Sequence, residues 1–316
     1  MKKLIPAAVL LAAFGSAHAD ATVYGLVDMS YSKTIADDIA DLKADFHSGG
    51  DGGSSYGNSA SRIGVKGNAD VGKGIKANYK FETGGITSDG GVNPGGNFFN
   101  RQAWVGLSGG FGEVRLGRQD SVPFQTMIDF DFNAAANIAS AYFNSGVAAW
   151  MPDRQSRSLQ YISNEMGGLK VQAGFVPEGN TAGDKSTLSL GVTYTLDKLV
   201  VAVAAESKRT ETSKNFSSVA ARYDLGVVKV AATYANGGTK ASKGFGLGVT
   251  ATVGDGINVG AQLGRNSDKT TAIELFVNKE VLKNLYAYVD VGNLQNKSTT
   301  PTVKGTGFAL GAIYVF

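Results

Sequence analysis

The side chains of this chain offer little for covalent or metal chemistry. Its 316 residues include no cysteine and two histidines, His18 and His47. His18 falls within a predicted leader segment, so neither a Cys–His pair nor a multi-histidine zinc site can be assembled. A Ser–His–Asp triad would have to use His47, in a Gly-, Ser- and Asp-rich stretch typical of solvent-exposed loops. We therefore expect no enzymatic activity and no cofactor.

What the chain does offer is charge at alternate positions, opposite apolar residues. Arg62 and Lys66 have one parity, and Ile63 and Val65 have the other. Successive side chains of a β-strand point to opposite faces, so the cations would lie on a polar face and the apolar residues on its reverse. Arg101 is also assigned to the polar face, and Trp104 to the apolar face. The other charged positions assigned to the polar face are Lys80, Glu82 and Lys229. Such positions favour electrostatic action on ions and polar solutes.

The longest segment without this alternation is 120–153, and it is the third long loop in chain order. Its aromatic residues argue against disorder, and loops of this length in compact domains are usually functional. Folded inward, it would hold Asp129 and Asp131, with Asp120 at its start, opposite the cations. As an external loop it would simply be solvated, and the residues alone leave both alternatives open. Directly after it, Arg154 has polar-face parity and Arg157 lies close by.

Stretches of roughly ten residues with this period-2 pattern run along the whole chain, as in 75–82, 187–194 and 245–253. Ten residues suffice for a tilted strand to cross a membrane, whereas strands in a secreted β-sandwich or propeller average about five or six. Short turns alternate with long polar loops, as at the two ends of a barrel. We count sixteen strands; fourteen or eighteen remain open because boundaries within 196–236 are weak. The prediction is an all-β, transmembrane antiparallel barrel.

The start of the chain predicts export. Lys2 and Lys3 precede an apolar run over 5–14, and small residues at 17 and 19 mark a cleavage site. This is the pattern of a secretory signal peptide over residues 1–19, which leaves 20–316 as the barrel domain. Beyond it, no apolar run approaches the roughly 18 residues of a membrane helix.

Composition agrees with this class of protein. The 43 glycines are about twice the usual share, as in β-rich chains. Without Lys2 and Lys3 the chain carries 28 basic and 27 acidic residues, which argues against a nucleic-acid partner. In the last stretch, Phe308, Leu310 and Phe316 share one apolar face. We expect this stretch to be the closing strand, paired with 21–32, because a barrel in lipid leaves no edge unpaired.

Three segments carry a resemblance to a known family: 61–67 (SRIGVKG), 100–107 (NRQAWVGL) and 116–119 (LGRQ), supported by 22–28 (TVYGLVD) and the terminal YVF. The chain resembles the trimeric general porins of Gram-negative bacteria, of the beta-proteobacterial type. The resemblance implies a sixteen-stranded barrel in the outer membrane, a homotrimer, and a third loop folded into the lumen. It also implies contacts with outer-membrane lipid and lipopolysaccharide, and recognition of the last strand, through Phe316, by the barrel-assembly machinery.

The expected function follows from the resemblance and from parity together. Passive diffusion of small polar solutes and ions would pass a constriction between a basic wall and an acidic loop. The resemblance places Arg154 as the third constriction arginine. The basic wall comprises Arg62, Arg101, Arg154, Arg157 and Lys66; the acidic loop contributes Asp129, Asp131 and Asp120; Lys80, Glu82 and Lys229 line the lumen away from the constriction. More cations than acids predict a modest anion preference. A solute-specific channel and a surface adhesin remain alternatives, although the small polar residues of the lumen face favour an unspecialised channel.

Overall fold

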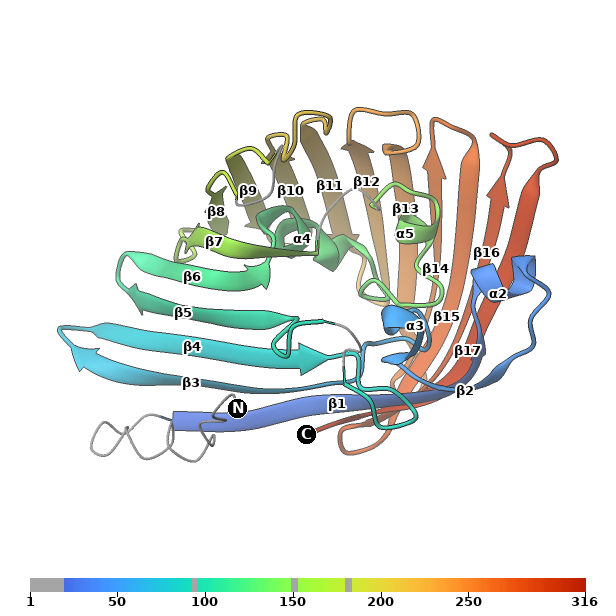
Figure 1. Ribbon diagram of the computed structural model, residues 1–316, viewed down its shortest axis with the longest axis horizontal. Coiled ribbons are helices and arrows are strands. Elements are labelled where there is room, and N and C mark those ends of the chain that lie inside the picture. The colour runs from blue at the N-terminus through green and yellow to red at the C-terminus, as the bar shows by residue number, and fades with distance from the viewer. Residues whose placement is uncertain (1–19, 93–95, 149–152, 180–183) are drawn as a thin grey trace, which may run out of the picture.

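The computed structural model describes residues 20–92, 96–148, 153–179 and 184–316, and within them the chain folds as one ring of strands (Figure 1). The predicted signal peptide, 1–19, lies outside these residues. The first half of the ring comprises β1 (Asp20–Lys33), β3 (Arg62–Gly72), β4 (Ile75–Gly84), β5 (Gln102–Gly109), β6 (Gly112–Asp120), β7 (Arg154–Ile162), β8 (Leu169–Val176) and β9 (Thr187–Leu196). The second half comprises β10 (Leu199–Glu206), β11 (Phe216–Asp224), β12 (Val228–Asn236), β13 (Lys243–Val253), β14 (Ile257–Asn266), β15 (Thr270–Leu282), β16 (Leu285–Asn296) and β17 (Val303–Val315).

Every barrel strand pairs antiparallel with its neighbours, and β1 closes the ring. Its first half pairs with β3, with Tyr24 opposite Gly64, and its second half pairs with β17, with Val27 opposite Tyr314. The amide of Gly25 donates to the carbonyl of Phe316 at 2.9 Å. The predicted sixteen strands and closing strand are therefore confirmed. A seventeenth short strand, β2 (Asp45–Ser48), belongs to the first loop and pairs with β1 beyond the point where β3 departs.

The two faces of the sheet differ in the way that the alternation predicts. On β15 the outward residues Ile273, Leu275 and Val277 are exposed, whereas the inward Glu274 and Phe276 are buried. This arrangement repeats around the ring and gives an apolar outer surface. Since lipid offers no hydrogen bonds, a closed ladder with an apolar exterior is the form in which strands can cross a membrane. No helix in the described part of the chain is long and apolar enough to cross one.

The third loop, here called L3 (121–153), joins β6 to β7, and its described residues 121–148 lie inside the ring (Figure 1). It contains α4 (Val122–Met127), a 3-10 turn η1 (Ile128–Phe130) and α5 (Ala141–Asn144). The hydroxyl of Ser121 caps α4 by accepting from the amide of Phe124 at 3.1 Å, and Pro123 occupies its first turn. Met127 and Phe130 pack on alanines of the barrel wall, among them Ala204 and Ala220. The inward folding of the third loop is therefore confirmed, and small wall residues make room for it.

The remaining short elements, α2 (Ile35–Ile39) and α3 (Asp51–Ser54), belong to the first loop. This loop also meets L3, because the amide of Ile138 donates to the carbonyl of Gly57 at 3.1 Å. L3 is thus held at its start by β6, along its length by the wall from β9 to β15, and near its middle by the first loop.

Candidate pore constriction

Glu82 lies at the centre of a charged cluster on the inner face of β1 and β3 to β7, here called the basic wall. Its carboxylate receives Arg101 Nε at 2.5 Å, the hydroxyl of Tyr24 at 2.7 Å, and Lys80 Nζ at 3.7 Å. Glu82 is 3% exposed, so these partners replace water around its charge. The prediction that Lys80 and Glu82 lie away from the other cations is wrong, because Glu82 pairs with Arg101, and Lys80 lies near Glu82 and opposite Lys66 in the β3–β4 register.

The structure brings together the three arginines predicted for the constriction. Arg62 stands opposite Gly84 in the β3–β4 register, and Arg101 lies over the same glycine. A Cβ at position 84 would lie 2.3 Å from Arg101 Cδ, so glycine there makes the approach possible. Arg154 reaches Asp120 Oδ1 at 3.4 Å and also contacts Asp153. The charges of the three guanidinium groups act on one another, which is the condition in which arginine, unlike lysine, keeps its proton.

Arg101 joins this cluster for a reason that strand parity does not give. Trp104 was expected to face lipid, but it is buried on the inner face, where its Nε1 donates to Gln102 Oε1 at 2.9 Å. Arg115 stacks over the Trp104 ring at 4.4 Å. Arg101 precedes β5 and has the outward parity, yet its side chain bends inward to Glu82. The expected position is observed, but the ion pair produces it.

Lys66 and Lys80 both lie over one aromatic ring, that of Tyr24. Their Nζ atoms lie 5.1 Å and 5.4 Å from the centroid of Tyr24, and the two lysines are opposite each other across β3 and β4. The ring faces attract both cations and hold them on the lumen side. Lys229 lies elsewhere, at the turn end of the β11–β12 hairpin, 3.9 Å from Asp224 Oδ2. Lys229 has the inward parity and lies away from the cluster, and its place in the lumen lining stays a prediction.

Arg157 does not belong to the basic wall. The pairing of β6 with β7 is irregular between Gly117 and Gln119, and Arg157 has a φ of 56°. Bulges re-aim side chains locally. Arg157 is consequently exposed, and its guanidinium lies beside Gly179 and the carboxylate of Asp184, among the loops that follow β8 and β10. The expectation for Arg157 is therefore corrected.

The acids predicted for L3 take three different positions. Asp131 is 6% exposed and accepts hydrogen bonds from Gln262 Nε2 and Ser140 Oγ, both at 2.8 Å. It therefore anchors the loop to the wall and does not line the passage. Asp120 pairs with Arg154 and belongs to the basic wall, not opposite it. Asp129 is exposed on L3, as the prediction requires.

Anchoring of L3 involves a second layer of acids that sequence reasoning missed. Glu274 is fully buried and accepts from Gln262 Nε2 at 2.9 Å and from the amide of Ala141 at 3.0 Å. Asn133 donates to Glu274 at 2.8 Å and to Asp290 at 3.1 Å. The only sequence signal is a carboxylate on the inward parity of a strand, which by itself does not distinguish anchoring from lining.

Among the described residues, the cluster around Glu82 therefore holds five cations, Arg62, Arg101, Arg154, Lys66 and Lys80, and two carboxylates, Glu82 and Asp120. The Arg115–Glu113 pair lies nearer the turn end of β6 and adds no net charge. L3 occupies the opposite side of the lumen, against β9 to β15. A membrane barrel with an inward loop facing a charged wall is the architecture of a channel.

Comparison with known proteins assigns the family. The sequence profile described as Gram-negative porin matches residues 7–299. Outer membrane porin protein 32 of Delftia acidovorans is 30% identical over 80% of this chain and 77% of its own length. Major outer membrane protein P.IB of Neisseria gonorrhoeae is 32% identical and covers 61% of this chain and 53% of that protein. The chain belongs to the Gram-negative porin family, and its relatives include porins of beta-proteobacteria, as the resemblance predicted.

Solved structures show the same fold. The anion-selective porin from Comamonas acidovorans aligns with a TM-score of 0.74 at 22% identity, covering 95% of this chain and all of that one. OmpT of Vibrio cholerae, in its trimer form, aligns with a TM-score of 0.66 at 16% identity. The protein is thus an outer-membrane porin that spans the membrane as a β-barrel.

Proposed function

We propose that the protein is a general diffusion porin whose basic wall makes it prefer anions. The observation that carries this proposal is the charge balance around Glu82: five cations gather there with two carboxylates among the described residues, while Asp131 of L3 is buried. Asp129 remains the exposed acid that we propose for the loop side.

The physical mechanism is a fixed field across a narrow aqueous passage. Clustered guanidinium groups stay ionised and concentrate anions locally. Polar solutes align with the field between the basic wall and L3, whereas apolar ones must displace ordered water. No step requires binding energy or chemical conversion, so solutes move down their own gradient. The preference proposed is modest, because Glu82 and Asp120 offset part of the positive charge.

Two relatives support finer parts of the proposal. The Comamonas acidovorans neighbour is described as anion-selective, and the Vibrio cholerae neighbour is described in a trimer form. We extend both properties to this chain, as an anion preference and a homotrimer. Contacts with lipopolysaccharide and recognition of Phe316 by the assembly machinery stay predictions. A solute-specific channel or an adhesin is the alternative on the same barrel.

Planar-bilayer recording tests the proposal. In a KCl gradient, the reversal potential should have the sign of chloride selectivity, and closures should occur in groups of three. A clear potassium selectivity would contradict the assigned basic wall. Liposome swelling with a series of neutral sugars should give rates that fall smoothly with size, and one outlying solute would instead support a specific channel.

A further inference from the structure

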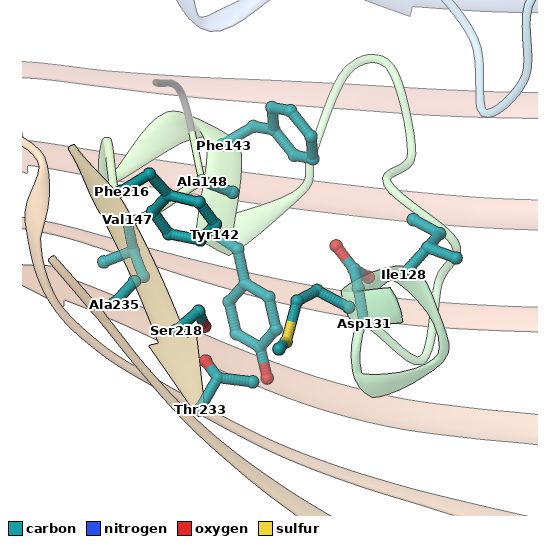
Figure 2. Close-up of a pocket in the computed structure, with 11 residues that line it drawn as sticks. Ile128, Asp131, Tyr142, Phe143, Val147, Ala148, Phe216, Ser218, Thr233 and Ala235 are labelled. Carbon is teal, nitrogen blue, oxygen red and sulfur yellow. The ribbon is translucent and has the colours of Figure 1, made fainter. Parts of the chain in front are cut away.

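A second feature of the lumen lies away from the basic wall. Between L3 and the inner face of β11 and β12 there is a half-enclosed hollow. Met127, Phe143 and Val147 of L3 line it together with Phe216 and Ala235 of the strands. Asp131 of L3 also belongs to the lining (Figure 2). The lining is thus mostly apolar, which is unusual inside a water-filled barrel and typical of ligand pockets.

Two hydroxyl oxygens without a partner face each other across this apolar lining. Figure 2 shows the phenol of Tyr142 pointing toward Thr233. Tyr142 is 5% exposed, and neither its hydroxyl nor that of Thr233 has a hydrogen-bond partner among the described residues. Ser218, which also lines the hollow, is already satisfied, since its hydroxyl donates to the carbonyl of Tyr234 at 2.9 Å. A buried hydroxyl without a hydrogen-bond partner costs free energy, so a polar ligand group that bonded with these two hydroxyls would be stabilised there.

The position of Tyr142 is built into the wall rather than accidental. Its ring lies against the glycines of β13: a Cβ at Gly246 would come within 2.5 Å of the ring, and one at Gly248 within 3.2 Å of the hydroxyl. Side chains at these two positions would push the phenol out of the hollow. The barrel therefore holds the Tyr142 oxygen at one fixed point beside an apolar cavity, which is the combination that orients a small amphiphilic ligand.

We propose that the hollow is a solute subsite for an aromatic ring that carries one hydroxyl. The ring would pack among the side chains of Met127, Val147 and Phe216, and its hydroxyl would bond with Tyr142 and Thr233. A hydroxyl can donate to one of these oxygens and accept from the other, so it satisfies both. The inference rests on the proposed pore function for access, because the solute reaches the hollow through the lumen. It adds a class of solutes that the pore retains briefly beside L3.

The test compares 4-hydroxybenzoate with benzoate in single-channel recordings. Both are ionised at neutral pH, and they differ in the ring hydroxyl alone. For the unaltered protein we expect 4-hydroxybenzoate to reduce the current saturably at millimolar concentration, as suits a ligand of about ten non-hydrogen atoms, and benzoate to act about fivefold more weakly, the usual effect of one neutral hydrogen bond. Tyr142→Phe should reduce this difference, and Tyr142→Phe combined with Thr233→Val should abolish it, without changing the response to benzoate. Equal action of both compounds on the unaltered protein would overturn the proposal.

A cavity-filling variant provides the structural control. Ala235→Leu should fill the hollow and remove the response to both compounds, whereas Ala231→Leu, at another inward position of β12 outside the hollow, should retain it. If the Ala235 variant fails the gel-shift test for folded barrel, Thr233→Val, which removes the second hydroxyl at nearly unchanged volume, should reduce the difference between the two compounds. Retention of the response in the filled variant would refute the site.

The two proposals fail separately. Chloride-to-potassium selectivity, measured in every variant, should stay unchanged, because the hollow contributes no charge to the basic wall. If the pore proved cation-selective, the proposed function would fail, and the neutral pair 4-hydroxybenzyl alcohol and benzyl alcohol would still decide whether the hollow discriminates the ring hydroxyl.

Discussion

Replacement of Glu82 by glutamine removes a charge from the basic wall while preserving the shape of the side chain. Glu82 accepts from Arg101 and Tyr24 through separate oxygens, at 2.5 Å and 2.7 Å. The amide oxygen of glutamine can still accept from one of them, so Arg101 keeps an anchor. We therefore expect the positive charge to stay in place and the anion preference to rise.

The magnitude follows from the charge balance. Five cations and two carboxylates give the described basic wall a net charge of +3, and Glu82→Gln raises it to +4. A unit charge about 7 Å from a passing ion contributes about 0.6 kcal/mol in water. The contribution favours chloride and disfavours potassium equally, so the permeability ratio should rise about sevenfold at low salt. Screening at 0.1 M salt reduces the rise to about threefold.

Reversal potentials at two salt concentrations measure this effect, with two controls. Arg101→Gln should lower the ratio by a similar factor, and the double variant should return near the unaltered value because its net charge is unchanged. Glu113→Gln removes an acid paired with Arg115 at the turn end of β6, so its effect should be smaller. A ratio that falls in Glu82→Gln would refute the reasoning, since it would mean that Glu82 is required to hold Arg101 in the lumen.

Two further predictions concern L3. Burial raises the pKa of Asp131 above its ordinary 3.8. Between 3.8 and the raised pKa, the folded chain keeps a proton that the unfolded chain has lost. The contribution of Asp131 to stability is therefore fully present below pH 3.8 and is lost as pH rises through the raised pKa. Urea midpoints from pH 4 to 8 should decline less steeply in Asp131→Asn, and an identical slope would count against this assignment. Gly264→Ala places a Cβ 2.4 Å from the carbonyl oxygen of Ala141, so L3 should shift and conductance should change with the barrel still folded. Gly110→Ala, where a Cβ meets no atom within 4 Å, should conduct normally.

The barrel could be predicted from the sequence because its rules are local. Side-chain parity is the same for every strand, and turns and loops alternate along the chain, so the strand count and the faces of most strands follow without knowledge of distant contacts. The faces of β5 were the exception, since Trp104 lies inside. The boundaries left open between 196 and 236 resolve into β10, β11 and β12. The length of L3 also indicated a special role, because loops this long in a compact domain are usually functional.

The site was only partly predictable, because parity gives the face of a side chain but not its height along the barrel. Height depends on register between strands far apart in sequence, such as the bond from Tyr24 to Glu82 across 58 positions. Lys80 and Glu82 were therefore assigned to the right face and the wrong level. The prediction for Arg157 was wrong for a different reason. An irregularity in the β6–β7 pairing changes the side-chain parity locally, and the sequence carries no signal for it.

The acids that anchor L3, one in the loop and two on β15 and β16, show how burial affects the charge balance inside the barrel. The chain as a whole is nearly neutral once the predicted leader is set aside. Three acids nevertheless accept hydrogen bonds from Asn133, Gln262 and the loop backbone. They are Asp131, Glu274 and Asp290, and none of them is more than 6% exposed. Cations on the opposite wall outnumber their acidic partners, because Arg101 and Lys80 share Glu82 and Arg154 pairs with Asp120. Under the proposed function, a neutral chain thereby presents a positive passage, because the side chains that hold the loop in place are the ones that would otherwise have balanced the arginines.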